Sequence, residues 1–541
     1  MISRMPNRQY AYFRDDQIVF LMTHSSKDRL IEDDLKSWRD AIEPSLNGAK
    51  VVWPPRWFSF RNLGDNEYLP STGDPRFLQP FSTVVCDMKN VPRDPLEFLN
   101  FILNLSNQST GLIGQTFGGL TTEAISPNWL ASSASQSGGT GGPGSWPVPY
   151  RGNPSRAPYQ FRDLISKLKE QGIYGDGEGV DVAILDTAPC PHDLVAAYKE
   201  CKSWHPLIHT LLGPNGKLKL YPATYEESLR MGSTSLNKHD YKMTDHGLFT
   251  AGIIHSIVPQ ATIHLIEVLN AFGVGDLESL SGGLQKVLDQ IYQKPVAPAE
   301  SDPPQEPRRK LVVNCSWMLE LPRVEEHLQA LSYTDPEYEF EQAVWQLAVN
   351  DENQALALRG KCERLMALGR QVIAAAGNDW KEKTTRSTAP ATRFPAAFLS
   401  TFGVGALPKD STPDPVTHKR EASSYSNLAD VPDDPEIKRI ITLGGEEGEG
   451  RGVLGLYLDE FPGCEPMPNC TKWAWWAGTS FATPILTGAI AAVLSSPPRP
   501  EIAQDTPEIT QDAVELLFQK SIIVPNGTDA TEDVMAAIQV C

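Results

Sequence analysis

The chain has no apolar run long enough to cross a membrane. Its longer apolar runs, such as residues 483–494, fall short of the roughly 20 residues that a membrane helix needs. The N-terminal segment is polar and charged ahead of a short apolar stretch, and it shows no pattern for signal-peptide cleavage. From both absences we expect a cytoplasmic protein with no membrane partner.

Positive charge is scarce as well, whereas the cysteine content is ordinary. Lys and Arg number 48 against 67 Asp and Glu, which gives a net charge of −19 at pH 7. An acidic chain repels phosphate groups, so nucleic acid and anionic membranes are not expected partners. Of the eight cysteines, Cys464 and Cys470 could pair, but they are interpreted as free thiols because no secretion signal is present. No histidine has metal-ligand spacing, so we predict no metal and no cofactor.

A short motif towards the C-terminal end is the most informative part of the sequence. Residues 478–484 (Gly-Thr-Ser-Phe-Ala-Thr-Pro) run into an apolar segment rich in Ala and Gly. This pattern predicts a tight turn followed by a buried helix, with Thr479 or Ser480 as the N-cap and Pro484 in the first turn. Ser480 would then lie at the positive end of the helix, where an alkoxide or oxyanion is stabilised. A capped core helix without a catalytic role accounts for the motif equally well.

A nucleophilic serine needs a carboxylate, a base and an oxyanion donor, and the chain has one candidate for each. An apolar run from residue 179 ends in Asp186, as expected for a buried parallel strand that delivers a carboxylate at its C-terminal end. His246 opens a second helix rich in small residues. Another buried strand runs into Asn378, whose side-chain amide can donate to a developing oxyanion.

The order Asp186, His246, Asn378 and Ser480 resembles that of the subtilisin-like serine proteases, the subtilases. The local sequences AILDT, DHGLFTAGII, VIAAAGN and GTSFATP carry the resemblance, which covers roughly residues 176–495. It implies an α/β fold with a mostly parallel sheet and helices on both faces, and it implies serine endopeptidase activity on a protein or peptide substrate.

The resemblance also implies the catalytic roles. Ser480 attacks the scissile carbonyl while His246 takes its proton, and Asp186 holds the imidazole in the right tautomer. Asn378 and the backbone N–H of Ser480 stabilise the oxyanion, and water then resolves the acyl-enzyme.

The substrate cleft is implied by the same comparison. Extended substrate is expected to pair with residues 273–275 on one rim and with the segment at 315–318 on the other. Bulky Trp317 and Met318 should narrow the cleft. The implied substrate-binding residues are Gly273, Val274, Gly275, Ser316, Trp317, Ala375, Ala376, Gly377 and Arg393.

Arg393 is the position that bears on specificity. Aligning its Phe-Pro pair with the family places Arg393 at the base of the pocket for the side chain that precedes the cut. An arginine there predicts a preference for Asp or Glu. An exposed arginine on a loop of slightly different length is the other interpretation.

Three regions are expected along the chain. Residues 1–130 form a small α+β domain with strands at 17–22 and 82–88 and helices at 25–42 and from 94. Residues 131–158 form a Gly/Ser/Pro-rich linker. Residues 159–541 form the peptidase domain, with insertions near 200–240, 296–310 and 320–353. Subtilases often carry a prodomain of similar secondary structure, so we expect residues 1–130 to act as an intramolecular inhibitor of a zymogen. An unrelated accessory domain is the alternative.

Other functional interpretations stay open. A catalytically silent binding module would share the fold, although silent members usually lose one of the four groups. A transpeptidase would use the same acyl-enzyme with an amine acceptor. The segment between the His246 helix and the next strand is too short for the calcium loop of many secreted subtilases, so we predict no calcium there and an intracellular, regulated enzyme.

Overall fold

The computed structural model describes most of the chain. The described residues are 2–3, 13–24, 30–60, 77, 79–107, 111–133, 146–156, 160–236, 241–292, 310–321, 342–343, 355–370, 372–379, 392–409, 411–412, 420–427, 439–462, 467–497, 509–520, 523–525 and 536–538. They fall into two compact units. The first unit comprises Met1–Ala131, Gly275–Gln285 and Leu319–Arg364, and the second comprises Ser132–Val274, Lys286–Met318 and Leu365–Cys541. The division at 1–130, 131–158 and 159–541 stays a prediction.

The first unit is built on a sheet in which β1 to β7 pair antiparallel to one another. Its main strands have the order β12-β7-β2-β5-β3, and shorter strands pair at the sides. Their bounds are β1 (Ile2–Ser3), β2 (Phe13–His24), β3 (Lys50–Val51), β4 (Arg56–Phe60), β5 (Phe81–Lys89), β6 (Thr116–Phe117), β7 (Leu120–Ser133), β12 (Val274–Asp276) and β14 (Trp317–Leu319). The expected strands at 17–22 and 82–88 lie inside β2 and β5.

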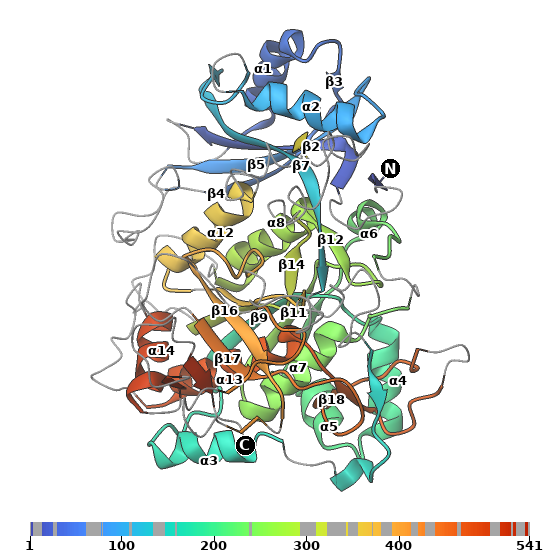
Figure 1. Ribbon diagram of the computed structural model, residues 1–541, viewed down its shortest axis with the longest axis vertical. Coiled ribbons are helices and arrows are strands. Elements are labelled where there is room, and N and C mark those ends of the chain that lie inside the picture. Colours follow the sequence, from blue (N-terminus) through green and yellow to red (C-terminus); the bar gives the residue numbers. More distant parts are fainter. Residues whose placement is uncertain are drawn as a thin grey trace, which may run out of the picture. The chain divides into compact units, whose positions relative to one another are not determined.

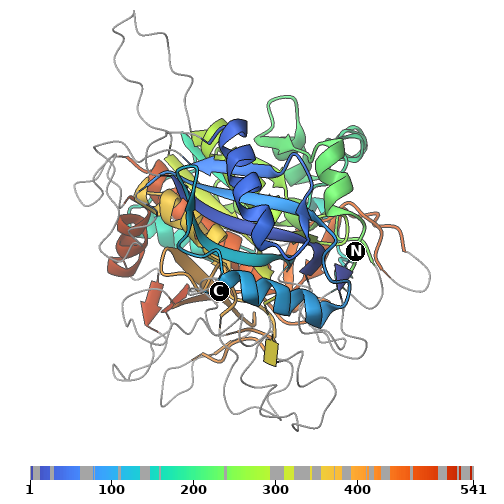
Figure 2. The ribbon, with the colours of Figure 1, turned by 90° about the horizontal axis from the view of Figure 1, so that it is seen from above.

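Two helices, α1 (Glu32–Ile42) and α2 (Pro95–Ser106), lie across the same face of this sheet (Figure 1, Figure 2). In α1 the apolar residues Leu35, Trp38 and Ile42 recur at helical spacing and are buried. The Asp94 carboxylate begins α2 by accepting the N–H groups of the second and third residues of the helix, at 3.0 and 3.1 Å. Residues 25–29 of the expected first helix lie outside the described residues.

The second unit contains a mostly parallel sheet with the order β10-β11-β9-β13-β15-β16-β17-β21-β20. Every neighbouring pair from β10 to β21 is parallel, and only β20 runs antiparallel to its neighbour. The bounds are β9 (Val180–Asp186), β10 (Leu218–Tyr221), β11 (Thr262–Glu267), β13 (Lys310–Cys315), β15 (Val372–Ala375), β16 (Thr401–Leu407), β17 (Arg439–Leu443), β20 (Ile523–Pro525) and β21 (Ala536–Ile538). This is the α/β class that the sequence predicts.

The strand order reverses at β9, which lies between β11 and β13. The chain leaves β9 for the β10–β11 side and later returns to build the other side of the sheet. Sites in open α/β sheets lie at such a switch point, beyond the carboxyl ends of the strands. Asp186 is the last residue of β9 and therefore stands there.

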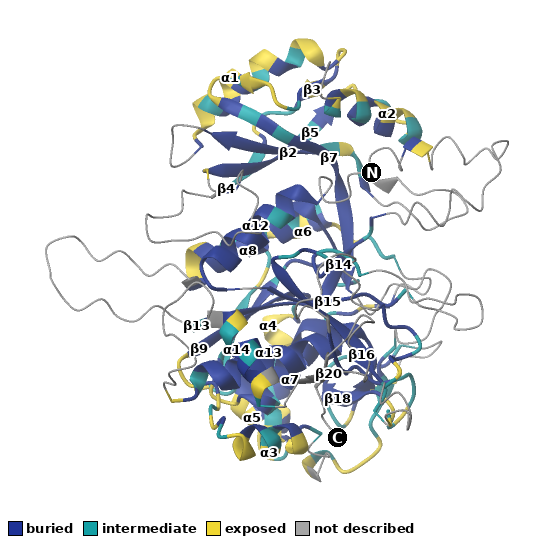
Figure 3. Cartoon of the chain, turned by 60° about the vertical axis from the view of Figure 1, so that its left-hand side comes forward, coloured by how far each residue is buried: buried dark blue, intermediate teal, exposed yellow. Residues whose placement is uncertain are grey.

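Two helices in the second unit are almost fully buried (Figure 3). They are α7 (His246–Ile257) and α13 (Thr479–Ser495), and every residue from Thr479 to Leu494 is buried. Their apolar residues join one large core that includes β9, β11 and β16. Small side chains make this close approach possible, since a Cβ at Gly488 of α13 would come within 2.9 Å of the Ile257 side chain in α7.

The remaining elements are a small sheet and further helices. A small antiparallel sheet has the order β18-β19-β8, with β8 at Val148–Pro149, β18 at Val453–Leu456 and β19 at Trp473–Trp476. The other helices are α3 (Arg162–Glu170), α4 (Pro191–Cys201), α5 (Pro206–Leu212), α6 (Tyr225–Met231), α8 (Leu277–Lys286), α12 (Leu356–Ala367) and α14 (Ile509–Gln519), with short 3₁₀ turns at Glu43–Ser45 and Pro154–Arg156 and a π-helical segment at Val287–Tyr292.

The predicted insertions have different outcomes. The described part of 200–240 contains α5, β10 and α6. The segments at 296–310 and 320–353 lie almost entirely outside the described residues. Within the part of the chain that the structure describes, no helix combines the length and apolar character needed to span a bilayer.

Candidate active site

The predicted acid and base are in direct contact. Asp186 Oδ1 and His246 Nδ1 are 2.7 Å apart, and both side chains are completely buried. The same carboxylate oxygen accepts the Thr187 N–H at 2.7 Å. With Nδ1–H donating to the carboxylate, Nε2 becomes the ring nitrogen that can exchange a proton with a hydroxyl.

The start of α7 is fixed against the end of β9. The Thr187 hydroxyl donates to the carbonyls of Met243 and Thr244, at 2.9 and 3.0 Å, and it accepts the Gly247 N–H at 3.2 Å. A Cβ at Gly247 would overlap the Thr187 carbonyl oxygen and come within 2.9 Å of Asp186 Cβ. The glycine after His246 is therefore needed for this close approach.

Aromatic rings enclose the imidazole. The ring centroids of Trp476 and Phe481 lie 5.4 and 5.2 Å from that of His246. Such packing restricts rotation of the imidazole and keeps water away from its hydrogen bond to Asp186.

The start of α13 differs from the sequence prediction. Gly478 is the N-cap residue, Thr479 and Ser480 are the first two residues of the helix, and Pro484 is its sixth. The predicted cap at Thr479 or Ser480, with Pro484 in the first turn, was wrong. Because Pro484 has no N–H, it cannot bond to the carbonyl of Ser480, four residues earlier. That carbonyl instead accepts the Ser316 hydroxyl at 2.8 Å.

The Ser480 hydroxyl does not bond to the imidazole in this structure. Ser480 Oγ donates to the Ser316 carbonyl oxygen at 3.0 Å. The hydroxyl that lies 3.0 Å from His246 Nε2 belongs to Ser133, and it is fully buried. The Ser133 N–H donates to the carbonyl of Gly273 at 2.8 Å. Ser133 therefore contacts both the predicted base and Gly273, one of the predicted substrate-binding residues.

Sequence reasoning missed Ser133. Its one signal was a run of serines and glycines after residue 131, which indicated a linker. The chain stays extended as far as Ser133, where β7 ends, and residues 134–145 lie outside the described residues.

Asn378 is oriented by the first residue of α13. Its Oδ1 accepts both the N–H and the hydroxyl of Thr479, at 3.0 and 2.9 Å, and the residue is 4% exposed. This pairing assigns Nδ2 as the hydrogen-bond donor of the amide. The Ser480 N–H, in the first turn of α13, belongs to the amides that have no acceptor within the helix. The predicted oxyanion donors thus come from adjoining elements.

Arg393 forms an ion pair that the sequence prediction did not include. Its Nε and Nη2 donate to the two carboxylate oxygens of Asp379, each at 3.0 Å, and the two side chains are 14% and 16% exposed. The Asn427 amide donates to the same carboxylate at 2.6 Å. Arg393 also lies close to Gly377, where an added Cβ would come within 3.0 Å of Arg393 Cγ. Arg393, the predicted specificity residue, thus lies next to Gly377 of the predicted pocket, and the Asp379 carboxylate balances its charge.

Both predicted rims of the substrate cleft, at residues 273–275 and 315–318, lie beside hydrogen bonds to β7. Glu320, next to β14, donates its N–H to the carbonyl of Leu130 in β7 at 2.9 Å. On the other rim, Gly273 bonds to Ser133, as described above, and Val274 is 1% exposed. Trp317 and Met318 are completely buried. Among the described residues, no group of three His, Cys, Asp or Glu side chains is arranged to hold a metal ion.

Comparison with known proteins agrees with this arrangement. The model of the Subtilase family matches residues 177–520. The chain belongs to the subtilase family. As a subtilase it is a serine protease, and its parallel sheet with flanking helices has the subtilisin-like fold.

Similar solved structures are distant in sequence. The patellamide maturation protease PatA is 19% identical over 67% of this chain and 94% of its own, with a TM-score of 0.35. A cold adapted subtilisin-like serine proteinase is 16% identical over 68% of this chain and 90% of its own, with a TM-score of 0.33. No curated protein matches the sequence significantly.

Proposed function

We propose that this subtilase is an endopeptidase that hydrolyses peptide bonds through Ser480, His246 and Asp186. The observation that carries the proposal is the buried hydrogen bond of 2.7 Å between Asp186 and His246 at the switch point of the sheet. Ser480, in the first turn of α13, supplies the nucleophile to the same unit.

The reaction is acyl transfer to water. Ser480 Oγ bonds to the scissile carbonyl carbon as its proton moves to His246 Nε2. Nδ2 of Asn378 and the N–H of Ser480 donate to the resulting oxyanion. His246 then protonates the leaving amine, and the acyl-enzyme remains. Water, deprotonated by His246, releases the second product and restores Ser480.

Two changes must precede catalysis. Ser133 has to leave His246 Nε2, and the Ser480 hydroxyl has to turn from the Ser316 carbonyl towards the freed nitrogen. Residues 1–130 are therefore proposed to act as an inhibitory prodomain whose last strand, β7, ends in the substrate position. The position of Ser133 supports a zymogen over an unrelated accessory domain.

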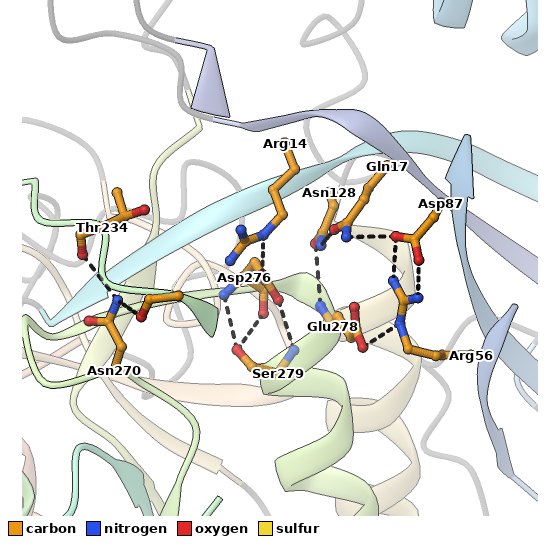
Figure 4. A network of polar contacts seen from close by, with 11 residues as sticks. Arg14, Gln17, Arg56, Asp87, Asn128, Thr234, Asn270, Asp276, Glu278 and Ser279 are labelled. Atoms are coloured by element: carbon orange, nitrogen blue, oxygen red, sulfur yellow. Dashed lines mark hydrogen bonds and ion pairs between the residues drawn. The ribbon is translucent and has the colours of Figure 1, made fainter. Parts of the chain in front are cut away.

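Two ion pairs strengthen this proposal (Figure 4). Arg14 of β2 bonds to Asp276 at 2.6 Å, and Arg56 of β4 bonds to Glu278 at the start of α8, also at 2.6 Å. The two acidic side chains are only 4% and 6% exposed. Removing one partner of a buried ion pair typically costs about 3–5 kcal/mol. These pairs would therefore hold the N-terminal strands to residues 276–278, which belong to the same compact unit, until they are broken.

We propose only a weak preference for Asp or Glu before the cut in the wild type. A substrate carboxylate has to compete with Asp379 for Arg393, because Asp379 already binds the guanidinium with two hydrogen bonds. The acidic preference should therefore be weak in the wild type and stronger when Asp379 is made neutral.

Cleavage of a diverse peptide library tests these proposals together. We expect wild-type cuts that are absent with Ser480→Ala, an acidic preference that increases with Asp379→Asn, and loss of that preference with Arg393→Gly. Equal cleavage by the wild type and Ser480→Ala would contradict the triad. Cuts unaffected by Arg393→Gly would contradict only the specificity.

A further inference from the structure

The carboxylate of Asp245, directly before His246, makes contacts that the triad does not explain. Asp245 is the N-cap residue of α7, yet its side chain makes no capping hydrogen bond. Its Oδ2 instead accepts the N–H groups of Leu458 and Asp459, at 2.5 and 2.7 Å. The residue is 2% exposed. Two amides that converge on one buried carboxylate form charge-assisted hydrogen bonds, which are about twice as strong as neutral ones.

The segment that Asp245 binds is itself well anchored. It follows β18, and the Tyr457 N–H donates to the Lys472 carbonyl at 3.1 Å. The Asn469 amide donates to the Tyr457 carbonyl at 2.7 Å. The Tyr457 ring lies 5.9 Å from that of Trp476, which in turn packs against His246. Asp245 therefore ties α7 to a rigid part of the same unit.

The turn before His246 is held from the opposite side too. Thr187 binds the carbonyls of Met243 and Thr244, as described above, and the Thr244 hydroxyl donates to the Asp459 carboxylate. The last residues before α7 thus lie between the end of β9 and the segment after β18. The position of the imidazole depends on both contacts.

We propose that Asp245 is a positioning residue that fastens the first turn of α7 to residues 458–459 and so keeps His246 Nε2 aligned with Ser480. This inference rests on the proposed triad and adds a residue to it. Asp245 acts through the backbone of α7 and need not touch substrate.

The charges around Asp245 make this contact depend on pH. Burial first, and then the charge of Asp459, raise the pKa of Asp245 to about 7, while the two backbone N–H groups oppose the shift. The more distant Asp193 of α4 acts in the same direction as Asp459, and the buried Tyr457 and Tyr241 complete the surroundings. Asp245 therefore gains a proton as the pH falls through about 7, and its strong acceptor is lost.

Labelling of Ser480 by a fluorophosphonate tests the proposal in the full-length chain, because this reaction needs an aligned His246 but no bound peptide. We expect Asp245→Ala to lower the labelling rate by about 10²-fold, the effect of a small misplacement of a catalytic group. Asp245→Asn keeps only a neutral acceptor for both amides, as protonated Asp245 does, so above pH 7 it should be labelled more slowly than the wild type but faster than Asp245→Ala.

The pH profile separates positioning from a general loss of stability. In the wild type, protonation of Asp245 below about pH 7 should contribute to the loss of labelling at low pH. Asp245→Asn should lack this contribution, and Asp459→Asn should move it to lower pH because a like charge is removed.

Several outcomes would overturn the proposal. A labelling rate of Asp245→Ala equal to that of the wild type would do so. A pH profile of labelling that is identical for Asp245→Asn and the wild type would also do so, and this comparison remains decisive if Asp245→Ala does not fold. Equal labelling of the wild type and Ser480→Ala would instead contradict the proposed triad, so the two failures are distinguishable.

Discussion

Ser133 Oγ lies 3.0 Å from His246 Nε2, in the place where the nucleophile of a serine protease bonds to its base. The Ser480 hydroxyl is meanwhile directed to the Ser316 carbonyl. Two buried hydroxyls thus compete for one ring nitrogen, and in this structure the one from β7 holds it. Under the proposed mechanism this contact restrains the enzyme, because His246 Nε2 can accept the Ser480 proton only while Ser133 is displaced.

Replacing Ser133 should release the base. In Ser133→Ala the Ser480 hydroxyl can turn to His246 Nε2. The hydrogen bond lost between Ser133 and His246 contributes about 0.5–1.5 kcal/mol, so labelling of Ser480 in the full-length chain should rise by about 2- to 10-fold. Ser132→Ala is the matched control, because that side chain has the same size and a neighbouring place on β7. Identical rates for the wild type and Ser133→Ala would show that the contact does not restrain the enzyme.

The ion pair between Arg56 and Glu278 should hold the N-terminal domain more strongly than a surface pair. Arg56→Gln is expected to lower the unfolding midpoint and to raise Ser480 labelling, because it leaves the Glu278 carboxylate buried without the guanidinium. Adding Glu278→Gln should recover part of the loss.

Lys36→Gln serves as the control for that experiment. Lys36 pairs with Glu32 on the exposed face of α1, where solvent screens the two charges and such a pair contributes little to stability. Additive effects of Arg56→Gln and Glu278→Gln would mean that the two residues are not coupled.

Asn378→Ala should lower kcat by about 10²–10³ with little change in KM, because the amide acts on the oxyanion rather than on the bound substrate. Asn378→Asp has almost the same shape, but it replaces the donor by an acceptor and should be no better. Peptide hydrolysis under saturating substrate measures the effect. A loss confined to KM would place Asn378 in substrate binding instead.

Lys361 of α12 should make stability depend on pH. Its side chain is fully buried and donates to the Thr83 hydroxyl and, at 3.2 Å, to the Ala357 carbonyl. Burial lowers the pKa of Lys361 to about 7. Between about pH 7 and the ordinary lysine pKa of about 10.4, the unfolded chain binds more protons, so stability rises with pH.

Lys361→Met should flatten that dependence and stabilise the protein near pH 7, since no charge is then buried. Urea unfolding across this pH range gives the comparison. Equal pH slopes for the wild type and Lys361→Met would show that the lysine is not the titrating group.

Much of the site follows from sequence because it depends on local pattern. A run of seven buried residues ends in Asp186, and the small residues around His246 and Ser480 predict helices that pack closely. The order of the blocks then identifies the family. The strands and helices of residues 1–130 were predictable for the same reason, from alternation and helical spacing.

The remainder depends on contacts between distant segments. Ser133 meets His246 across 113 positions of sequence, so no local pattern reports it. Asp379 follows Asn378 directly, yet the sequence did not predict its ion pair with Arg393. The direction of the Arg393 side chain is set by the fold of its loop, which no local pattern reports. The start of α13 was misplaced since Ser316, far earlier in the chain, supplies the bond that Pro484 cannot make.

Trapping of the acyl-enzyme tests the central claim most directly. The full-length chain and Ser480→Ala are mixed with an activated ester that acylates serine proteases, quenched in acid and digested for mass spectrometry. The account predicts one acyl group per chain, formed slowly because Ser133 competes for His246, on the peptide that contains Ser480, and none in the variant. An acyl group on any other residue, or equal acylation of both proteins, would contradict it.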